Sequence, residues 1–205
     1  MNGKCLHWYT IQSTARIFFM TSALFSTRRQ LSAAAAASVL GLALCSKAAQ
    51  ADDSKLPEPH HAAIAGNPAD AAPMVLAARR YAAFWNTGDE QYARQALSPD
   101  FIDRTLPAGR LQGVAGPLQA SQGFRGAVPD LTVEINDMVV ADDRVSLHLH
   151  FRGHFSGQFG KLKGKGQAID FQAFDLYRIA DGRIAENWHL EDNLSLMQQF
   201  GAIRP

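Results

Sequence analysis

The chain has 205 residues, of which 47% are apolar and 19% charged, with a formal net charge of +1. This composition is typical of a globular protein with one sizeable core and excludes collagen-like and intrinsically disordered classes. All 19 acidic residues follow residue 51, against 15 basic ones in the same segment, and this mildly acidic balance argues against nucleic-acid binding.

Residues 1–51 have the pattern of an export signal. Arg28 and Arg29 precede an apolar run over residues 33–44, and a small-x-small cleavage site at Ala49 and Ala51 follows it. The paired arginines resemble a twin-arginine signal, and the apolar run is too short to span a bilayer. We therefore predict a periplasmic or secreted protein that keeps no stable membrane anchor after cleavage.

The predicted leader also contains Met20 and both cysteines, Cys5 and Cys45. A start at Met20 would leave a signal of conventional length, so we expect residues 1–19 to be a mis-assigned start or disordered. A mature protein without the leader has no thiol, which excludes a disulfide, a thiolate zinc site and a cysteine nucleophile. We identify no cofactor site in the sequence.

Residues 52–72 contain three prolines and no apolar period. We predict that they form a flexible linker. A single domain would then occupy residues 73–205.

The predicted domain places its helices first and its long strands last. Apolar spacings of three and four, with turn residues between them, predict helices over residues 74–85, 90–97 and 116–126. Runs rich in β-branched and aromatic residues predict a short strand at 101–102 and long ones at 131–140, 144–152, 168–179 and 183–192. This order predicts an α+β fold in which helices cover one face of a curved antiparallel sheet.

Four segments of the domain occur in a familiar order: YAAFWNTGD (81–89), SPDFID (98–103), FRGAVPDL (124–131) and LYRIADGRIAENW (176–188). Together they resemble the SnoaL-like polyketide cyclase, or ester cyclase, family, which shares a cone-shaped fold with ketosteroid isomerase and nuclear transport factor 2. The resemblance covers residues 74–203 and implies that the N-terminal helices pack on the concave face of the sheet. It also implies a homodimer, and an aldol cyclisation that needs a base and an acid but no metal or cofactor.

The resemblance places the polar pocket on Trp85, Asp103, Ala173, Asp175 and His189. Asp103 stands where the cyclases have Asn, and Ala173 where they have Gln. Asp175 replaces the strand His, and His189 replaces the catalytic Asp of the last strand. The His/Asp pair is thus retained with its members exchanged, and we predict Asp175 and His189 as the catalytic pair. The ligand-binding candidates are Trp85, Asp103, Phe124, Ala173, Tyr177 and Asn187.

The turn at Asp181-Gly182 decides whether this pair can meet. A two-residue turn would place Asp175 opposite Trp188 and turn His189 to the other face of the sheet. A three-residue turn with a bulge would place Asp175 opposite Asn187, with His189 on the same face. The family's pocket implies the second register, which we adopt; it makes Asp175 and His189 diagonal neighbours.

Two further groups have both a functional and a structural interpretation. His148, His150 and His154 alternate along one strand, either as metal ligands or as a polar face. Lys161, Lys163 and Lys165 alternate with glycine or leucine in a predicted loop, either to attract an anionic ligand or as a solvated hairpin tip.

The sequence therefore predicts an exported protein that binds a small, mostly apolar, oxygenated molecule. Acid/base catalysis by Asp175 and His189, in a cyclisation or a related isomerisation, is one hypothesis. A non-catalytic ligand-binding or interaction module of the same fold is the other. A third alternative is an isomerase or hydrolase in which Asp103 or Asp175 acts as the base.

Overall fold

Residues 51–204 are described by the structure, which is a computed structural model. The predicted export signal, except for Ala51, lies outside the described residues. Within the described range, no helix has both the length and the apolar character needed to cross a membrane.

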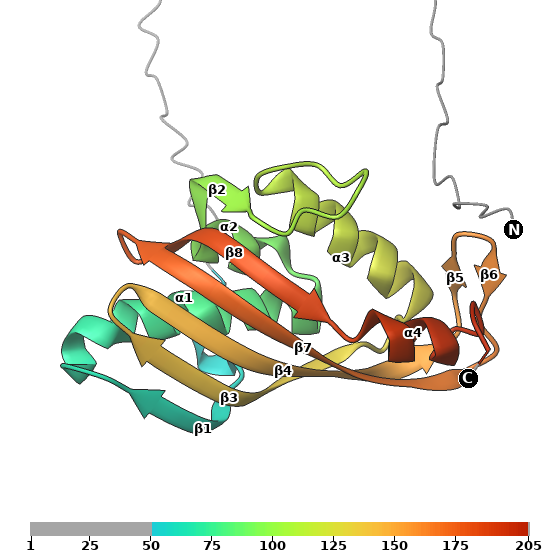
Figure 1. Ribbon diagram of the computed structural model, residues 1–205, viewed down its shortest axis with the longest axis horizontal. Helices are drawn as coiled ribbons and strands as arrows, with labels where there is room; N and C mark the ends of the chain where they lie inside the picture. The colour runs from blue at the N-terminus through green and yellow to red at the C-terminus, as the bar shows by residue number, and fades with distance from the viewer. Residues whose placement is uncertain (1–50, 205) are drawn as a thin grey trace, which may run out of the picture. The chain divides into compact units, whose positions relative to one another are not determined.

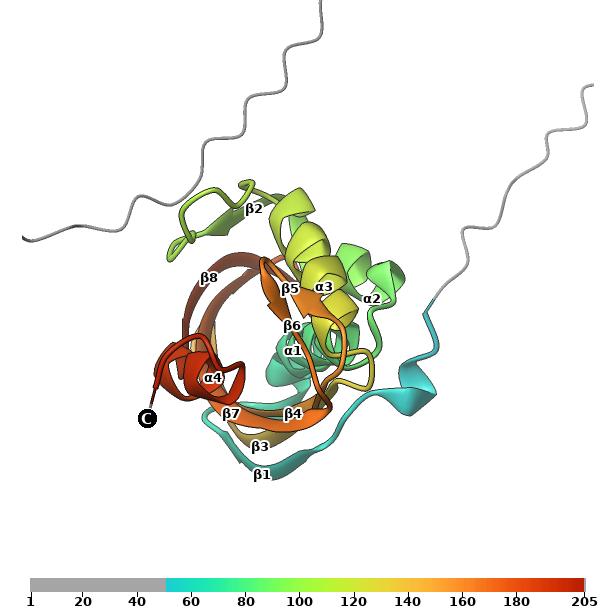
Figure 2. The same ribbon diagram turned by 90° about the vertical axis from the view of Figure 1, so that its right-hand side faces the viewer.

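A strongly curved sheet forms one layer of the domain (Figures 1 and 2). Its order is β1-β3-β4-β7-β8-β2; the four central strands are antiparallel, and β1 and β2 add to the two edges in parallel. The strands are β1 (Pro59–Ile64), β2 (Leu97–Asp103), β3 (Thr132–Ala141), β4 (Arg144–Phe155), β7 (Gln167–Ala180) and β8 (Arg183–Glu191). The predicted α+β fold is confirmed, with parallel edge pairs that the sequence pattern did not indicate.

Helices and a small hairpin complete the domain. α1 (Pro68–Thr87) packs on the concave face of the sheet, α2 (Glu90–Ala96) follows it, and α3 (Ala115–Ala127) lies over the same side. The hairpin of β5 (Gln158–Phe159) and β6 (Leu162–Lys163) and the short helix α4 (Asn193–Gln199) stand at one end of the sheet.

α1 begins and ends at residues suited to those positions. Asn67 caps its first turn by accepting a hydrogen bond from the backbone N–H of Ala69 at 3.1 Å, and Pro68 follows where no N–H is needed. Gly88 ends it with φ of 78°, and a Cβ at this glycine would lie 2.8 Å from the Arg125 side chain. The helix begins at Pro68, which is six residues before the start predicted from the apolar spacing.

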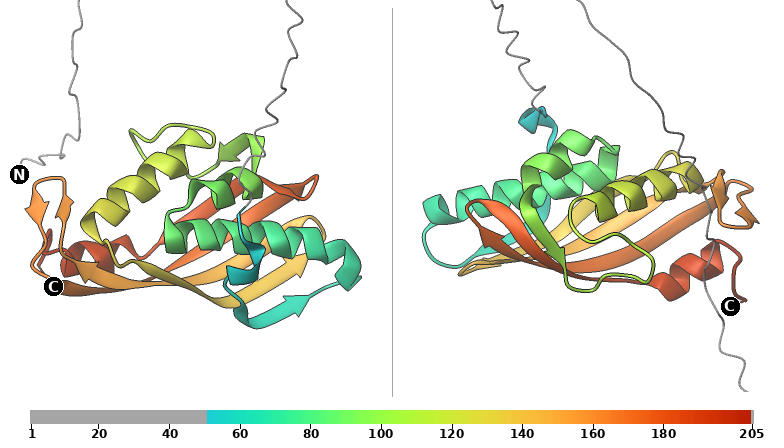
Figure 3. Two further views of the ribbon diagram at one scale, coloured as in Figure 1. Left: turned by 180° about the vertical axis from the view of Figure 1, so that it is seen from behind. Right: turned by 90° about the horizontal axis from the view of Figure 1, so that it is seen from above.

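The prediction of a flexible linker over residues 52–72 is wrong. Strand β1 pairs with β3 from Pro59 opposite Ile135 to Ile64 opposite Val140, and Figure 3 shows it at the edge of the sheet. The preceding turn is held on α1 by an ion pair of 2.5 Å between Arg80 and Asp53. Strand β1 is joined to the sheet through its backbone, while its side chains are mostly exposed. Because no face of this strand is buried, its sequence shows no apolar alternation.

The core lies between the concave face of the sheet and the helices. Along β4, Val145, Leu147, Leu149 and Phe151 are buried, whereas the residues between them are more exposed. The face of α1 that packs on the sheet is rich in alanine, and these small side chains let the helix approach the sheet closely. The alanines that are almost fully buried are Ala77, Ala78, Ala82 and Ala83.

The β7–β8 hairpin differs from both registers considered above. Asp181 and Gly182 have φ of 50° and 69° in a two-residue turn, with Ala180 opposite Arg183. The register then shifts by one residue between Arg178 and Ile179, so Asp175 lies directly opposite His189. The two residues share a face, as predicted, but the bulge lies within the strands and not in the turn.

Candidate functional site

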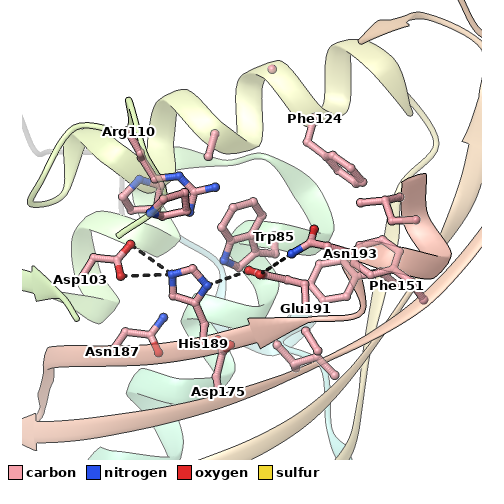
Figure 4. A pocket seen from close by; sticks show the side chains of 18 of the residues that line it. Trp85, Asp103, Arg110, Phe124, Phe151, Asp175, Asn187, His189, Glu191 and Asn193 are labelled. Carbon is pink, nitrogen blue, oxygen red and sulfur yellow. Dashed lines mark hydrogen bonds and ion pairs between the residues drawn. The ribbon is translucent and has the colours of Figure 1, made fainter. Parts of the chain in front are cut away.

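A cavity of about 550 Å³ lies between the concave face of the sheet, α1, α3, α4 and the loop after β2. Its two ends differ in chemistry. Figure 4 shows polar side chains on β8 and β2 at one end and aromatic side chains at the other. The polar lining includes Asp103, Asp175, Asn187, His189 and Glu191; the apolar lining includes Phe124, Phe151, Phe159, Phe171, Leu196 and Met197.

His189 is held between two carboxylates, neither of which is Asp175. Its Nδ1 is 2.7 Å from Glu191 Oε1, and its Nε2 is 3.1 Å from each oxygen of Asp103. Burial acts to lower the pKa of His189, but the hydrogen bond and charge of Glu191 and the charge of Asp103 outweigh it and raise the pKa to about 9. The ring is therefore protonated at neutral pH, with both N–H groups donating to carboxylates.

Asp103 is fixed at the end of β2 by its neighbours. Gln112 clamps its backbone: Oε1 accepts from the Asp103 N–H at 2.7 Å, and Nε2 donates to its carbonyl at 3.0 Å. The Asp103 side chain accepts from the backbone N–H of Thr105 at 2.9 Å. The Thr105 hydroxyl in turn accepts from the backbone N–H of His189 at 2.9 Å. This local network aligns the carboxylate with the imidazole ring.

Asp175 lies in a different environment from the other carboxylates. It is buried, and its Oδ2 accepts a hydrogen bond of 2.6 Å from the Tyr177 hydroxyl. Burial raises the pKa of Asp175 to about 6, although the Tyr177 hydrogen bond and the charge of His189 both oppose the rise. The predicted Asp175–His189 pair is thus coupled by charge but makes no hydrogen bond, because the ring is committed to Asp103 and Glu191.

The remaining predicted ligand-binding residues divide into two groups. Trp85, Phe124, Ala173 and Asn187 line the cavity. Tyr177 does not: its ring is fully buried beneath the site, 5.8 Å from the ring of Tyr81 in an edge-on contact. The prediction that Tyr177 contacts ligand is therefore not supported by its position, and its hydroxyl serves Asp175 instead.

Two charged cavity residues, Glu191 and Arg110, were missed by the sequence reasoning. Glu191 follows His189 by two residues on the same strand, so the alternation of side chains could have placed it on the same face. Its burial acts to raise its pKa, but the hydrogen bond and charge of His189 lower it overall. Arg110 lines the cavity from the irregular loop between β2 and α3, where no periodic signal could have placed it.

The three alternating histidines lie on the outer face and the end of β4, away from the cavity. His148 contacts Asp137 at 2.9 Å, His150 contacts Asp170 at 2.6 Å, and His154 contacts Asp130 at 2.7 Å. In the described part of the chain, no group of three or more His, Cys, Asp or Glu side chains is placed to hold a metal ion.

The three lysines are exposed on or beside the β5–β6 hairpin. Phe159 of the same hairpin lines the cavity and packs 5.0 Å from the ring of Phe200. The hairpin therefore places positive charge near one end of the cavity.

Comparisons with known proteins support the fold described above. The profile of the SnoaL-like polyketide cyclase family matches residues 75–200. The structure of a proposed polyketide cyclase from Bacillus cereus is 41% identical, with a TM-score of 0.67, and the match covers 73% of this chain and 95% of that one. No curated protein matches the chain.

Two structures from Streptomyces species are more distant. TsrD from Streptomyces laurentii is 25% identical with a TM-score of 0.59, over 64% of this chain and 97% of its own. IdmH from Streptomyces antibioticus, a proposed polyketide cyclase, is 26% identical with a TM-score of 0.55, over 63% and 98%. On the profile match and the 41% identity, the chain belongs to the SnoaL-like polyketide cyclase family.

Proposed function

We propose that this protein is an acid/base catalyst that removes a proton from carbon next to a carbonyl group, with Asp175 as the base. The observation that carries the proposal is a buried carboxylate that lines a largely apolar cavity and whose pKa is raised to about 6. Such a group is ionised at neutral pH and yet more basic than an ordinary aspartate.

The proposed reaction is an intramolecular aldol cyclisation of an apolar, oxygenated substrate. Asp175 takes the C–H proton, and the resulting enolate carbon attacks a second carbonyl of the same molecule. The alkoxide formed in this step then takes the proton back from Asp175, so that one residue serves both as base and as acid. His189 supplies a fixed positive charge beside the reacting atoms.

The aromatic end of the cavity supports an apolar substrate. Phe151 and Phe171 stack with ring centroids 4.9 Å apart, and Phe124 meets Phe171 edge-on at 5.9 Å. These rings offer flat apolar walls to a ring-containing ligand. An oxygenated end group would then lie near Asp175.

A ligand-binding module without catalysis is the second candidate function. It is favoured by one observation, that both N–H groups of His189 are bound to carboxylates, so the residue has no free proton for a substrate. Asp175 would then have to carry out both proton transfers alone.

Hydrogen–deuterium exchange into 2-tetralone tests the two candidates. This ketone combines an aromatic ring with acidic C–H groups, and its exchange needs only the first step. We expect protein-catalysed exchange that increases as the pH rises through about 6, and that falls by about 10²- to 10⁴-fold in Asp175→Asn. Asp170→Asn, on the outer face of the same strand, is the control. Binding of the ketone without exchange at any pH would instead establish the second candidate, a ligand-binding module without catalysis.

A further inference from the structure

Asn187 has a buried side chain whose hydrogen-bonding capacity is unused. The residue is only 4% exposed, and its Oδ1 has no hydrogen-bond partner. Among the described residues, neither end of the amide is hydrogen-bonded to another group, whereas the Asn187 backbone carbonyl accepts from the Arg104 N–H at 2.8 Å. Oδ1 is an acceptor, whereas the N–H groups at the other end of the amide are the donors that a ligand oxygen could use.

The position of Asn187 in the sheet places it between the charged groups of the site. It lies opposite Tyr177 on β7 and opposite Asp103 on β2. It lines the cavity two residues before His189 on the same strand face. Figure 4 shows its amide nitrogen on the side of Asp103 and His189.

The other polar side chains that β7 and β8 turn into the cavity are already paired. His189 donates to Asp103 and Glu191, and Asp175 accepts from Tyr177. Among the side chains that these two strands turn into the cavity, Asn187 therefore supplies the hydrogen-bond donor that is left for a ligand oxygen.

We infer that Asn187 binds the carbonyl oxygen of the ligand, with its amide N–H donating to that oxygen. The inference rests on the proposed function for its catalytic meaning: when Asp175 removes the C–H proton, negative charge develops on the same oxygen, and the hydrogen bond from Asn187 becomes stronger. Asn187 is then the residue that selects for a carbonyl group.

A matched pair of ligands tests this role without relying on turnover. 2-Tetralone and tetralin share a bicyclic framework and differ by replacement of the carbonyl with CH₂. We expect the unmodified protein to bind the ketone about tenfold more tightly than the hydrocarbon, and Asn187→Leu to remove this preference. Asn187→Ala should do the same, which guards against a packing defect specific to leucine.

Ser121→Ala is the control variant. Ser121 also has a buried oxygen without a partner, but it does not line the cavity. Its substitution should leave the ratio of the two affinities unchanged, which separates a ligand contact from a general effect of removing a buried polar atom.

The outcomes distinguish this inference from the proposed function. Loss of the preference in both Asn187 variants supports the inference even if the protein catalyses no exchange, in which case only the catalytic proposal fails. A preference that persists in the variants overturns the inference, whatever the exchange rate. Equal binding of the two ligands to the unmodified protein, or binding of neither, also overturns it.

Discussion

Strand β7 carries one aspartate on each side of the sheet, and the two experience different environments. The side chain of Asp170 is 62% exposed on the outer face, beside His150 and Arg152. Asp175 is 7% exposed on the inner face, where burial raises its pKa to about 6. The chemistry of a carboxylate in this fold is thus decided by the side of the sheet to which its position in the strand assigns it.

The histidines show the same contrast. His189 lies within the cavity between two carboxylates, and its pKa is raised to about 9. His148 meets one carboxylate on the outer face and stacks on Phe174 with ring centroids 4.5 Å apart. Removing one member of a buried charge pair leaves the other uncompensated, so loss of His189 should destabilise the fold far more than loss of His148.

Removal of the two histidines measures this difference. We expect His189→Gln to lower the free energy of unfolding at pH 7 by about 3 kcal/mol, because Asp103 and Glu191 are left facing each other in a buried site. His148→Gln should cost less than about 1 kcal/mol. Because the folded-state pKa of His189 is raised from 6.5 to about 9, its contribution is complete below pH 6.5 and is lost as the pH rises through 9. Denaturant unfolding of both variants at pH 7 and 10 checks this, and equal losses at pH 7 would contradict the comparison.

Of the two aspartates, Asp175 but not Asp170 should make stability depend on pH. The folded-state pKa of Asp175 is raised from 3.8 to about 6, so the unfolding free energy should fall by up to about 3 kcal/mol as the pH rises from 4 to 6. Asp175→Asn should remove this fall and be the more stable protein at pH 8. Asp170→Asn should retain the fall of the unmodified protein. A pH profile of Asp175→Asn with the same slope would show that Asp175 is not the buried acid.

The charge partners of His189 can be separated by NMR titration. Glu191→Gln should lower the pKa of His189, because its hydrogen bond and charge are the largest influences that raise it. A fall of about one in the pKa of His189 would correspond to the loss of about 1.4 kcal/mol of favourable interaction with the protonated ring. Glu134→Gln, on the outer face, should leave the pKa unchanged. An unshifted His189 in Glu191→Gln would mean that Asp103 alone holds the proton.

The outer face also carries exposed apolar side chains. Phe174 and Leu190 lie opposite each other on β7 and β8 and are 56% and 74% exposed, and such exposed patches often mark interfaces. We propose that a second copy of the chain covers them. Leu190→Lys should change the stability of the fold by less than about 0.5 kcal/mol. In light scattering, the same variant should shift the mass from dimer to monomer. A monomeric unmodified protein would exclude this interface.

Much of the fold could be predicted from the sequence because its determinants are local. Alternation along residues 144–152 and 168–179 predicted the central strands within a few residues of their ends. The parallel edge strand β1 could not be predicted in this way, because its backbone pairs with β3 while its side chains remain exposed. Its contacts are with residues about 75 positions away in the sequence.

The candidate site could be predicted in part. Family resemblance selected Asp103, Asp175 and His189, and all three line one cavity. The partner of His189 could not be predicted, because Asp103 reaches it from the parallel edge strand β2, a pairing that the sequence pattern did not indicate. Asn187 was predicted as a ligand-binding residue and lines the cavity, and alternation from His189 could have added Glu191.

Strand β1 has a consequence for any shortened form of this protein. The family match begins at residue 75, and a chain trimmed to that boundary would lack the strand that satisfies the backbone of β3. The N–H and C=O groups from Ile135 to Val140 would then form an open edge, available to strands of other molecules. Such a truncated protein should self-associate through β3, so the segment before α1 protects the solubility of the domain.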